Sequence, residues 1–567
     1  MTDIFAFVRK YQEKIMLLLL VVLVFVLRFL PISYGDLYSD NAINSFRAYG
    51  WFDYLGTSGQ SGPFEWLGHI PGWALLSFHD APPLGFLVQH IFFNLFGDSV
   101  VIARLPFVLA GIVSVFLVYF FLKKLTNQKT AVIAGLFYVV CSYSVWAGQA
   151  GYMEGLQELF IVGSLLSGGL FLFLNSSKKY IYIWALFLGG ALLTKYTAIF
   201  LVPPILIYAF LYRETFKKYW RDVLISIILM IVLLSPVIIY NIHVYGLRGH
   251  FDAALSSMVG MHPEDFKIIS DRSVSSDPIS NISNMFLILA RNVSYPFLVL
   301  FLICFVVLVW RIRSKGFGNF ESWVVVNMLF LILMFGFAGV AVRFLSVLVP
   351  FIVLIIALGL SHIQEINKNI IFRRVLWGIT AFIFVFELFY SFNTNVLKVP
   401  IGSAGIWHSA NKVKNLGFNE LDNFIRDNII TKLPEKQTIR KAEDIVFTSK
   451  EIKGKSVIVF DDRINWFAHM WYMQRYFLYY RWPVISTSYF SPTNPNKLDL
   501  AELMKVSGQP LYFIYPINPI VLDAVRSKDE SLNFVGPSLA EYLESLGASF
   551  TIIKNSQNIP AFKIYRF

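Results

Sequence analysis

Long apolar segments recur through the first 391 residues of this 567-residue chain, and each is close to the length that crosses a lipid bilayer. About 20 residues of helix span the hydrocarbon core. A transmembrane β-barrel would instead show alternating segments of about 10 residues. The sequence therefore predicts a polytopic α-helical membrane protein with about eleven transmembrane helices, at residues 14–31, 100–122, 130–147, 155–174, 180–194, 196–212, 223–241, 293–310, 320–340, 344–361 and 371–391.

The first apolar segment is predicted to be a retained helix. No small-residue cleavage site follows it, and it is longer than the roughly 7–15 apolar residues of a signal peptide. The two cysteines, Cys141 and Cys304, both fall in apolar segments. That position indicates neither a disulfide framework nor a thiolate metal cluster.

Basic residues are concentrated in the loops on one side of the predicted spans. These residues are Arg9, Lys10, Lys14, Lys123, Lys124, Lys129, Lys178, Lys179, Arg213, Lys217, Lys218, Arg221, Arg311, Arg313, Lys315, Lys368, Arg373 and Arg374. Because Lys and Arg are enriched in cytoplasmic loops, we expect a cytoplasmic N-terminus and an integral protein of the cell membrane. The net charge of +12 then reflects membrane orientation, and no nucleic-acid partner is expected.

The chain is predicted to have two domains. A transmembrane domain covers residues 1–391 and has two long outer loops, at 32–99 and 242–292. The first outer loop contains aromatic-rich segments with apolar faces at helical spacing, which are typical of helices lying in the membrane interface. Residues 392–567 alternate strand-like runs such as "DIVF" and "SVIVF" with helix-like segments. This pattern predicts a soluble extracytoplasmic α/β domain.

Ionisable residues gather at the outer boundary of the predicted membrane domain. They are Asp36, Asp40, Asp80, Arg104, Glu154, Lys195 and Arg343. Charged groups at membrane depth are costly and usually face a cavity or a partner. We therefore predict one site in which acids transfer a proton and cations bind a phosphate.

Several of these residues also have a purely structural interpretation. Asp36 or Asp40 is suited to cap the helix expected after position 40. The side chain of Arg104 is long enough to extend from a transmembrane span so that its guanidinium lies at the membrane interface. Glu154 is suited to the first turn of a helix, where it would interact with the helix dipole. Lys195 and Arg343 have apolar neighbours on both sides, which favours a functional role.

A divalent metal site is a weaker hypothesis. His79 stands beside Asp80, with His69 and His90 in the same loop. The spacing of these residues fixes little geometry, and interfacial polar side chains are the better account of it. No metal ligand is assigned, and a divalent cofactor stays an open alternative.

The ordered set of motifs resembles the GT-C membrane glycosyltransferases. The stretch "YSDNAINSFRAYGW" after the first span is followed by "HDAPPLGF", "FGDSVVIARLP", "GQAGYMEGLQELF", "LGGALLTKYTAIFLVPP" and "VRFLSVLVPF". The chain is most similar to the branch that contains the protein O-mannosyltransferases and the lipid A aminoarabinose transferases. It departs from that branch at Asn41, where a second acid is common, and at Ala81, where Lys often precedes the two prolines.

The resemblance implies an inverting glycosyltransferase that takes a sugar from a polyprenyl-phosphate donor in the membrane. A protein, lipid or glycan hydroxyl would be the acceptor, on the extracytoplasmic face. The resemblance implies that Asp40 is the catalytic base and Glu154 a second acid, with Asp36 a further candidate. Lys195, Arg343 and Arg104 would bind the donor phosphate, and Asp80 and His79 would lie in a donor or acceptor loop. The alternative is a transporter or flippase, although such proteins usually carry their charges near the bilayer midplane.

Overall fold

The protein was analysed as a computed structural model, which describes residues 2–54, 61–174, 177–266, 277–399, 401–402, 413–490, 500–523 and 534–567. Its contacts divide the chain into two compact units. We call Met1–Ser33, Leu76–Val88 and Val101–Val413 the membrane unit, and Tyr34–Leu75, Gln89–Val100 and Lys414–Phe567 the sheet unit. This division differs from a simple boundary between residues 391 and 392, because most of the first outer loop groups with the C-terminal residues.

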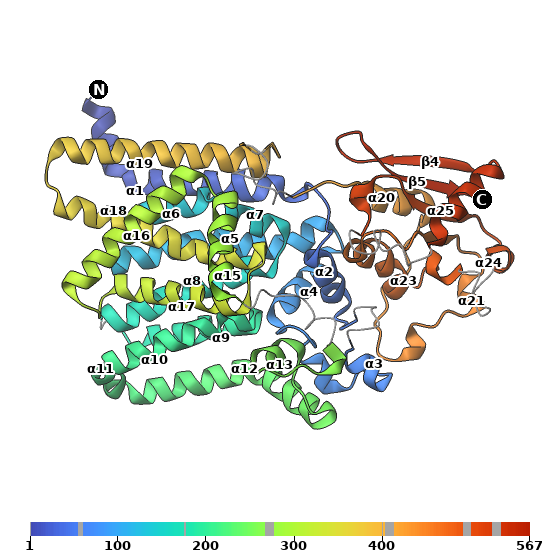
Figure 1. Cartoon of the computed structure of the whole chain (residues 1–567), viewed down its shortest axis with the longest axis horizontal. Helices are drawn as coiled ribbons and strands as arrows, with labels where there is room; N and C mark the ends of the chain where they lie inside the picture. The colour runs from blue at the N-terminus through green and yellow to red at the C-terminus, as the bar shows by residue number, and fades with distance from the viewer. Residues whose placement is uncertain are drawn as a thin grey trace. The chain divides into compact units, whose positions relative to one another are not determined.

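Long apolar helices form the membrane unit (Figure 1). Within the described residues, eight helices are long and apolar enough to span a membrane, and α6 with α7 makes a ninth that is bent by 54°. The two remaining predicted spans correspond to the shorter apolar helices Lys179–Thr194 and Tyr196–Leu211. Each of the eleven predicted segments therefore matches an apolar helix, although two of them fall short of the length of a full span.

The helices that build or extend this unit have the following bounds: α1 Thr2–Val24, η1 Phe25–Phe29, η2 Leu30–Ser33, α4 Leu84–Phe96, α5 Val100–Leu125, α6 Gln128–Val140, α7 Ser142–Ala150, α8 Met153–Leu174, α9 Lys179–Thr194, η4 Tyr196–Leu201, α10 Val202–Leu211, α11 Arg213–Lys218, α12 Trp220–Arg248, α13 Ala253–Met258, η5 Glu264–Phe266, α15 Pro278–Asn292, α16 Tyr295–Lys315, α17 Phe320–Ala338, η6 Val342–Leu348, α18 Val349–Ile366, α19 Ile370–Ser391 and η7 Phe392–Val396.

Helix α8 lies at the centre of the membrane unit. Of its most apolar window, 83% is buried, compared with 17% for α12. Glycines let α8 and α9 approach closely: a Cβ at Gly163 would lie 2.2 Å from Phe187, and one at Gly190 would lie 2.4 Å from Phe160. Small residues at such contacts are how helices pack in a membrane, where no hydrophobic effect drives them together.

A buried carboxylate connects three helices of the membrane unit. Glu387 on α19 is fully buried. Its two oxygens accept hydrogen bonds from the backbone amide of Ser142, at the start of α7, and from that of Ser294, which caps α16. Because the first amides of a helix have no partner inside the helix, one acid satisfies two helix starts.

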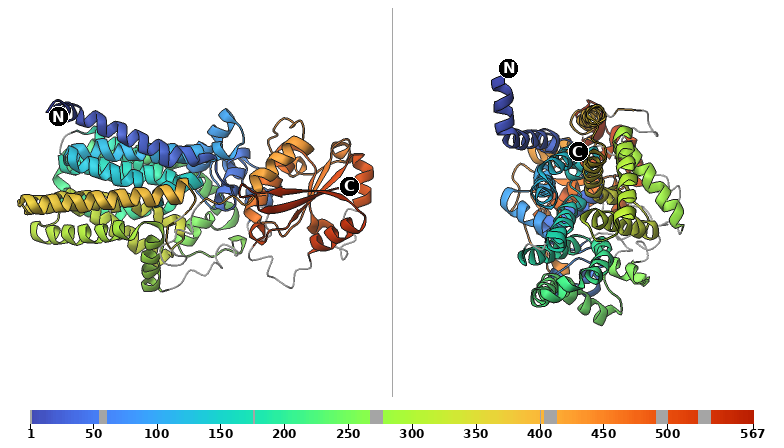
Figure 2. Two further views of the ribbon diagram at one scale, coloured as in Figure 1. Left: turned by 90° about the horizontal axis from the view of Figure 1, so that it is seen from above. Right: turned by 90° about the vertical axis from the view of Figure 1, so that its left-hand side faces the viewer.

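The sheet unit contains a five-stranded mixed sheet in the order β2-β1-β3-β5-β4. Strands β1 (Val457–Phe460), β2 (Val484–Ser486) and β3 (Leu511–Pro516) are parallel, whereas β5 (Pro560–Arg566) pairs antiparallel with β3 and with β4 (Ser549–Lys554). The sheet is seen nearly edge-on in Figure 2. The other elements of this unit are α2 Asp40–Gly50, α3 Pro63–Leu67, η3 Gly72–Leu75, α20 Phe418–Phe424, η8 Ile425–Ile429, η9 Ala442–Asp444, α21 Ser449–Ile452, α22 Trp466–His469, η10 Met470–Gln474, α23 Arg475–Tyr480, η11 Thr487–Phe490, α24 Leu500–Ser507, η12 Pro519–Val521 and α25 Val535–Ser545.

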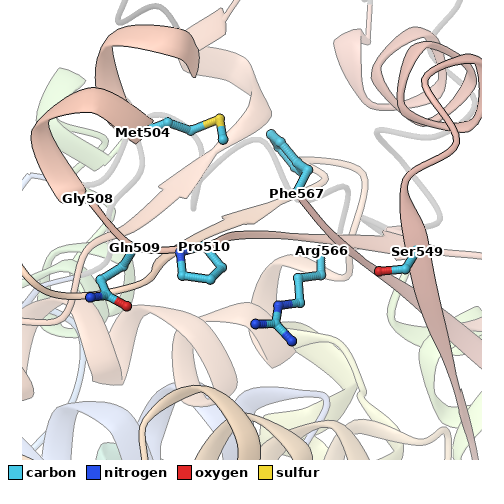
Figure 3. Close-up of a pocket in the computed structure, with 7 residues that line it drawn as sticks. All are labelled: Met504, Gly508, Gln509, Pro510, Ser549, Arg566 and Phe567. Atoms are coloured by element: carbon cyan, nitrogen blue, oxygen red, sulfur yellow. The ribbon is translucent and has the colours of Figure 1, made fainter.

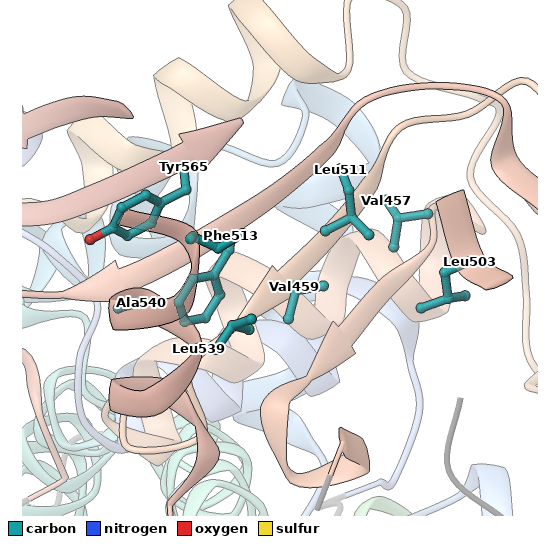
Figure 4. Packing of buried hydrophobic residues seen from close by; sticks show 9 residues of the cluster. Val457, Val459, Leu503, Leu511, Phe513, Leu539, Ala540 and Tyr565 are labelled. Carbon is teal, nitrogen blue, oxygen red and sulfur yellow. The ribbon is translucent and has the colours of Figure 1, made fainter. Parts of the chain in front are cut away.

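Side chains from β1, β3 and β5 form the core on one face of this sheet, as Figure 4 shows. Val457, Val459, Leu511 and Phe513 pack there with Leu539 of α25. The predicted α/β pattern of the tail is confirmed. One strand prediction was wrong, because "DIVF" is a turn: the carbonyls that would pair in a sheet, those of Asp444 and Val446, accept instead from Arg481.

Within the sheet unit, helix α2 of the first outer loop packs against an aromatic-rich segment of the tail that comprises α22, η10 and α23, residues 466–480. A Cβ at Gly50 would lie 2.0 Å from the ring of Tyr479, so only glycine permits this approach. The Tyr479 hydroxyl donates to the carbonyl of Phe46 at 2.9 Å, and Tyr49 meets Tyr480 through a hydroxyl contact of 2.7 Å. The aromatic tail segment is therefore packing core, which agrees with the usual role of such clusters.

Asp98 is held by two arginines in the same unit. Arg475 is fully buried, and its guanidinium lies 3.2 Å from Asp98 and 2.7 Å from Asp422. Arg426 reaches the same oxygen of Asp98 at 2.7 Å. Burial raises the pKa of Asp98, but Arg475 and Arg426 outweigh that effect and hold it at about 2, below the ordinary value of 3.8.

The ion pairs of Asp98 predict how the free energy of unfolding changes as the pH falls. A carboxyl whose folded pKa is lowered stabilises the fold above its unfolded pKa, and that stability is lost as the pH falls through the folded pKa. Asp98→Asn should therefore lower the free energy of unfolding by about 2 kcal/mol at neutral pH, and the difference from wild type should shrink between about pH 4 and pH 2. Melting curves of the full chain in detergent across this range measure the difference.

The control is Asp427→Asn, which removes an exposed carboxylate that forms no ion pair among the described residues. It should melt like wild type at every pH. A constant gap between Asp98→Asn and wild type down to about pH 2 would contradict the assigned ion pairs.

Candidate active site

Three of the predicted site residues meet in the membrane unit. Glu154 is in the first turn of α8, Lys195 separates α9 from η4, and Arg343 is the second residue of η6. One carboxylate oxygen of Glu154 lies 2.5 Å from the Lys195 ammonium and 3.5 Å from Nε of Arg343. Segments that lie 41 and 189 residues from Glu154 along the chain therefore present their cations to one acid.

Breaks in the helices present these cations. Lys195 has an extended backbone, with φ −156° and ψ 136°. The helical path is therefore broken at Lys195, between the end of α9 and the start of the short helix η4. The amide of Gln157, on α8, donates to the Thr197 hydroxyl at 2.9 Å and so fastens this break. The η6 segment is fastened by Tyr143, whose hydroxyl donates to the carbonyl of Val342.

The acid and the two cations of this cluster differ in exposure. The Glu154 side chain is 2% exposed, whereas Lys195 and Arg343 are about one-fifth exposed, at 20% and 22%. Both cations also lie over the ring of Phe344, at 4.1 Å and 4.9 Å from its centroid. The cluster therefore presents two cations on its more accessible side, with their common acid buried behind them, and convergent cations of this kind suit an anion.

A second polar cluster adjoins this one, and the sequence analysis missed it. Tyr196, next to Lys195, donates to Asp252 at 2.6 Å, and Asn241 donates to the same oxygen at 2.8 Å. Burial raises the pKa of Asp252, and the negative charge of Asp80 raises it further. The carbonyl of His79 accepts from the amide of Ala253 at 2.7 Å. Asp80 and His79 therefore belong to the η4 side of the membrane unit. Asp252 had a sequence signal in its position, since it caps α13.

Arg104 is in a different environment from Lys195 and Arg343. It is fully buried on α5 and donates to the carbonyl of Ile32 at 3.0 Å. Its aliphatic stem lies against Gly151, where a Cβ would be 3.1 Å from it and where φ is +76°. These contacts give Arg104 a role in packing the end of the first span onto α5.

Asp36 belongs to the sheet unit and is fully buried. Its carboxylate accepts from the backbone amides of Leu416, Gly417, Phe418 and Asn419 and so caps α20. Burial raises the pKa of Asp36 to about 6, although these hydrogen bonds act in the opposite direction. Helix capping, the structural interpretation given for Asp36 from the sequence, fits this geometry. The helix that Asp36 caps is α20, however, and not the helix that follows position 40.

Asp40 also belongs to the sheet unit. It is the first residue of α2, and its carboxylate accepts from the Ser39 hydroxyl at 3.3 Å. Unlike Asp36, it is partly exposed. His69 and His90 of the same unit bond to different carbonyls, those of Leu67 and Ala48.

A buried network lies one turn along α8 from Glu154, and the sequence analysis did not single it out. Glu158 accepts from the hydroxyls of Ser144 at 2.8 Å and Tyr138 at 3.1 Å. Arg28, from the first span, donates to Ser144 and to the carbonyl of Tyr138, both at 3.1 Å. The only sequence signal was a charged residue inside each of two apolar segments. The network connects η1, α6, α7 and α8 beneath the Glu154 cluster.

The sheet unit has an open pocket of about 540 Å³ beside the end of β5 (Figure 3). Its lining includes Met504, Gln509, Ser549, Arg566 and Phe567. None of the predicted site residues lines it, and Arg566 is its one charged side chain.

Part of the chain matches a protein-family model, and solved structures are similar to most of it. Residues 80–240 match the family model described as dolichyl-phosphate-mannose-protein mannosyltransferase. No curated protein matches the chain. The crystal structure of ArnT from Cupriavidus metallidurans bound to undecaprenyl phosphate is similar, with a TM-score of 0.56, 12% identity and coverage of 97% of both chains. The archaeal oligosaccharyltransferase AglB from Archaeoglobus fulgidus, in complex with an inhibitory peptide and a dolichol-phosphate, has a TM-score of 0.52 at 12% identity, and the alignment covers 89% of this chain and 70% of that one.

At this level of identity the likeness establishes the fold. The predicted fold class, a polytopic helical membrane protein of the GT-C type with a C-terminal sheet region, is confirmed. The chain is an integral membrane protein with the fold of these transferase structures.

Proposed function

We propose that this protein transfers a sugar from a polyprenyl-phosphate donor to an acceptor hydroxyl at the extracytoplasmic face of the membrane. The observation that carries the proposal is the convergence of Lys195 and Arg343 on the buried Glu154, with both cations more exposed than the acid. The similar ArnT and AglB structures, which contain undecaprenyl phosphate and a dolichol-phosphate, support a lipid phosphate as the anion. The family match at residues 80–240 supports a mannosyltransferase-like reaction.

The charge of the cluster suits the leaving group. When the acceptor oxygen attacks the anomeric carbon, the bond from that carbon to the phosphate oxygen breaks and its electron pair stays on the phosphate. The donor is a phosphodiester with one negative charge, and the product is a monoester with a greater one. Preorganised cations stabilise charge that develops in the transition state. Attack from the face opposite the phosphate inverts the anomeric carbon.

In this proposal, Glu154 positions Lys195 and Arg343 rather than the acceptor, because its carboxylate is already engaged with both cations. Asp40 takes the proton of the acceptor hydroxyl. Its partial exposure and its place after the first span support this role. Asp36 and Arg104 act by packing, which their buried hydrogen bonds support. Asp80 and His79 stay candidates for the loop that meets the donor or the acceptor.

The positions of the charges along the helices support the proposed orientation. Glu154 is at the start of α8, Lys195 at the end of α9, and Arg343 at the start of the Val342–Ile366 helix. The basic residues Lys178, Lys179, Lys368, Arg373 and Arg374 follow or precede the opposite ends of these helices. Since basic loops face the cytoplasm, the N-terminus is cytoplasmic in this proposal, and both the Glu154 cluster and the C-terminal residues are extracytoplasmic.

The first test removes the cations. Lys195→Met and Arg343→Met should each lower the turnover of dolichyl-phosphate mannose about a hundredfold or more, because each removes charge from the phosphate. Release of dolichyl phosphate from radiolabelled donor in proteoliposomes measures turnover with mixed cell-membrane acceptors. Since the cations act most strongly in the transition state, kcat should fall more than KM rises.

Lys179→Met is the matched control, because it removes an exposed lysine at the other end of α9 and should turn over donor like wild type. Unchanged turnover in both cation variants would overturn the proposed site. Movement of the donor across the bilayer without release of dolichyl phosphate would instead support the transporter or flippase alternative.

The second test separates two aspartates of the same loop. Asp40→Asn should lower kcat about a hundredfold or more, as expected when a general base is lost, and should leave the melting temperature unchanged. Asp36→Asn should lower the melting temperature, because an amide cannot accept all the bonds that the carboxylate accepts from Leu416–Asn419. Full activity in Asp40→Asn would exclude it as the base.

A further inference from the structure

The end of the membrane unit opposite the Glu154 cluster contains an apolar groove. The groove has a volume of about 380 Å³ and lies between α16, the end of α18 and the start of α19. Val306 and Trp310 of α16 line one wall, and Ile363 and Ile366 of α18 line the other. Figure 1 shows the loop that joins α18 to α19 at this end of the unit. Asn367, in that loop, is the one polar residue of the lining.

The groove opens toward the lipid-facing side of the helices. Val306 is 65% exposed, Trp310 58% and Ile366 55%. On membrane-spanning helices, exposed apolar side chains of this kind are covered by acyl chains, not by water. An exposed Trp near a helix end is typical of the membrane interface. The groove therefore suits an acyl chain whose head group lies at the level of the α16 and α18 ends.

Unpaired positive charge lies at that level. Val306, Trp310 and Arg313 follow at helical spacing, so Arg313 continues the groove wall one turn toward the end of α16. Lys368 follows Asn367 in the loop. Both residues are exposed, and neither forms an ion pair among the residues that the structure describes.

The neighbouring charges leave this surplus in place. Arg311 is neutralised, because it lies 3.0 Å from both Glu321 and Glu365. Arg373 donates to the carbonyls of Gln364 and Asn367 and so satisfies the end of α18. These partners account for Arg311 and Arg373. The exposed cations that are left in these segments are Arg313 and Lys315 at the end of α16 and Lys368 and Arg374 around the start of α19. Of these, Arg313 continues the wall of the groove and Lys368 directly follows Asn367 of its lining.

We propose that this groove binds an anionic phospholipid, with one acyl chain along Val306 and Ile363 and the phosphate between Arg313 and Lys368. Basic pockets between transmembrane helices are a general means of binding anionic head groups. The site is separate from the proposed sugar transfer, since it lies at the other ends of the helices. It gives the protein a preference for the lipid that surrounds its basic end.

The test measures lipid occupancy by native mass spectrometry. Full-length protein in detergent is titrated with dioleoylphosphatidylglycerol or with dioleoylphosphatidylcholine, which share acyl chains and differ in net charge. Wild type should bind the anionic lipid more tightly. Arg313→Gln combined with Lys368→Gln should weaken that binding about thirtyfold and should weaken phosphatidylcholine binding much less, because the choline ammonium of that lipid offsets the charge of its phosphate.

Two further variants make the result specific. Lys218→Gln combined with Arg221→Gln removes the same charge from exposed positions at the α11–α12 junction and should bind like wild type. Val306→Trp should weaken binding of both lipids, because the larger side chain occupies the groove from its lipid-facing wall. Equal binding of the two lipids by wild type, or unchanged phosphatidylglycerol binding in the Arg313 and Lys368 double variant, would overturn the proposal. Neither result would test the proposed sugar transfer, which is measured separately by the release of dolichyl phosphate.

Discussion

The carboxylate of Glu154 is enclosed by protein, and it is balanced by two cations from distant segments. A buried charge without partners costs several kcal/mol, so the acid and the cations stabilise one another's positions. Lys195 reaches the cluster only because the chain is extended between α9 and η4, and Arg343 only because η6 precedes α18. The helix breaks, the aromatic ring of Phe344 and the converging cations therefore belong to a single arrangement.

The same constraint operates deeper in the membrane unit, where buried charges are paired and are used to join helices. Arg28 and Glu158 share Ser144, and Glu387 bonds to the starts of α7 and α16. These contacts hold α7 and α8 in place next to the Glu154 cluster, while the glycines of α8 let α9 approach closely. These buried pairs give rigid support to the helices that carry the Glu154 cluster.

The sequence could predict what depends on local pattern. Apolar length predicted the spans, and charges amid apolar residues drew attention to Lys195, Arg343 and Glu154. Pairings between distant segments carry no such signal. The amides that the Asp36 carboxylate binds lie 380 or more positions away, so its capping of α20 was not predictable. "DIVF" has the composition of a strand, but hydrogen bonds from Arg481 prevent pairing. The bend between α6 and α7 was likewise hidden in a continuous apolar run.

The distribution of charge along the helices connects these observations. The Glu154 cluster occupies one set of helix ends, and Lys368, Arg373 and Arg374 lie at the other. At the first set, two cations converge on one buried acid. At the second, exposed cations are dispersed beside lipid-facing apolar side chains. Converging charge is suited to one phosphate in a fixed position, whereas dispersed charge is suited to the surface of a bilayer. The same electrostatic argument therefore underlies both the proposed orientation of the helices and the proposed position of the chemistry.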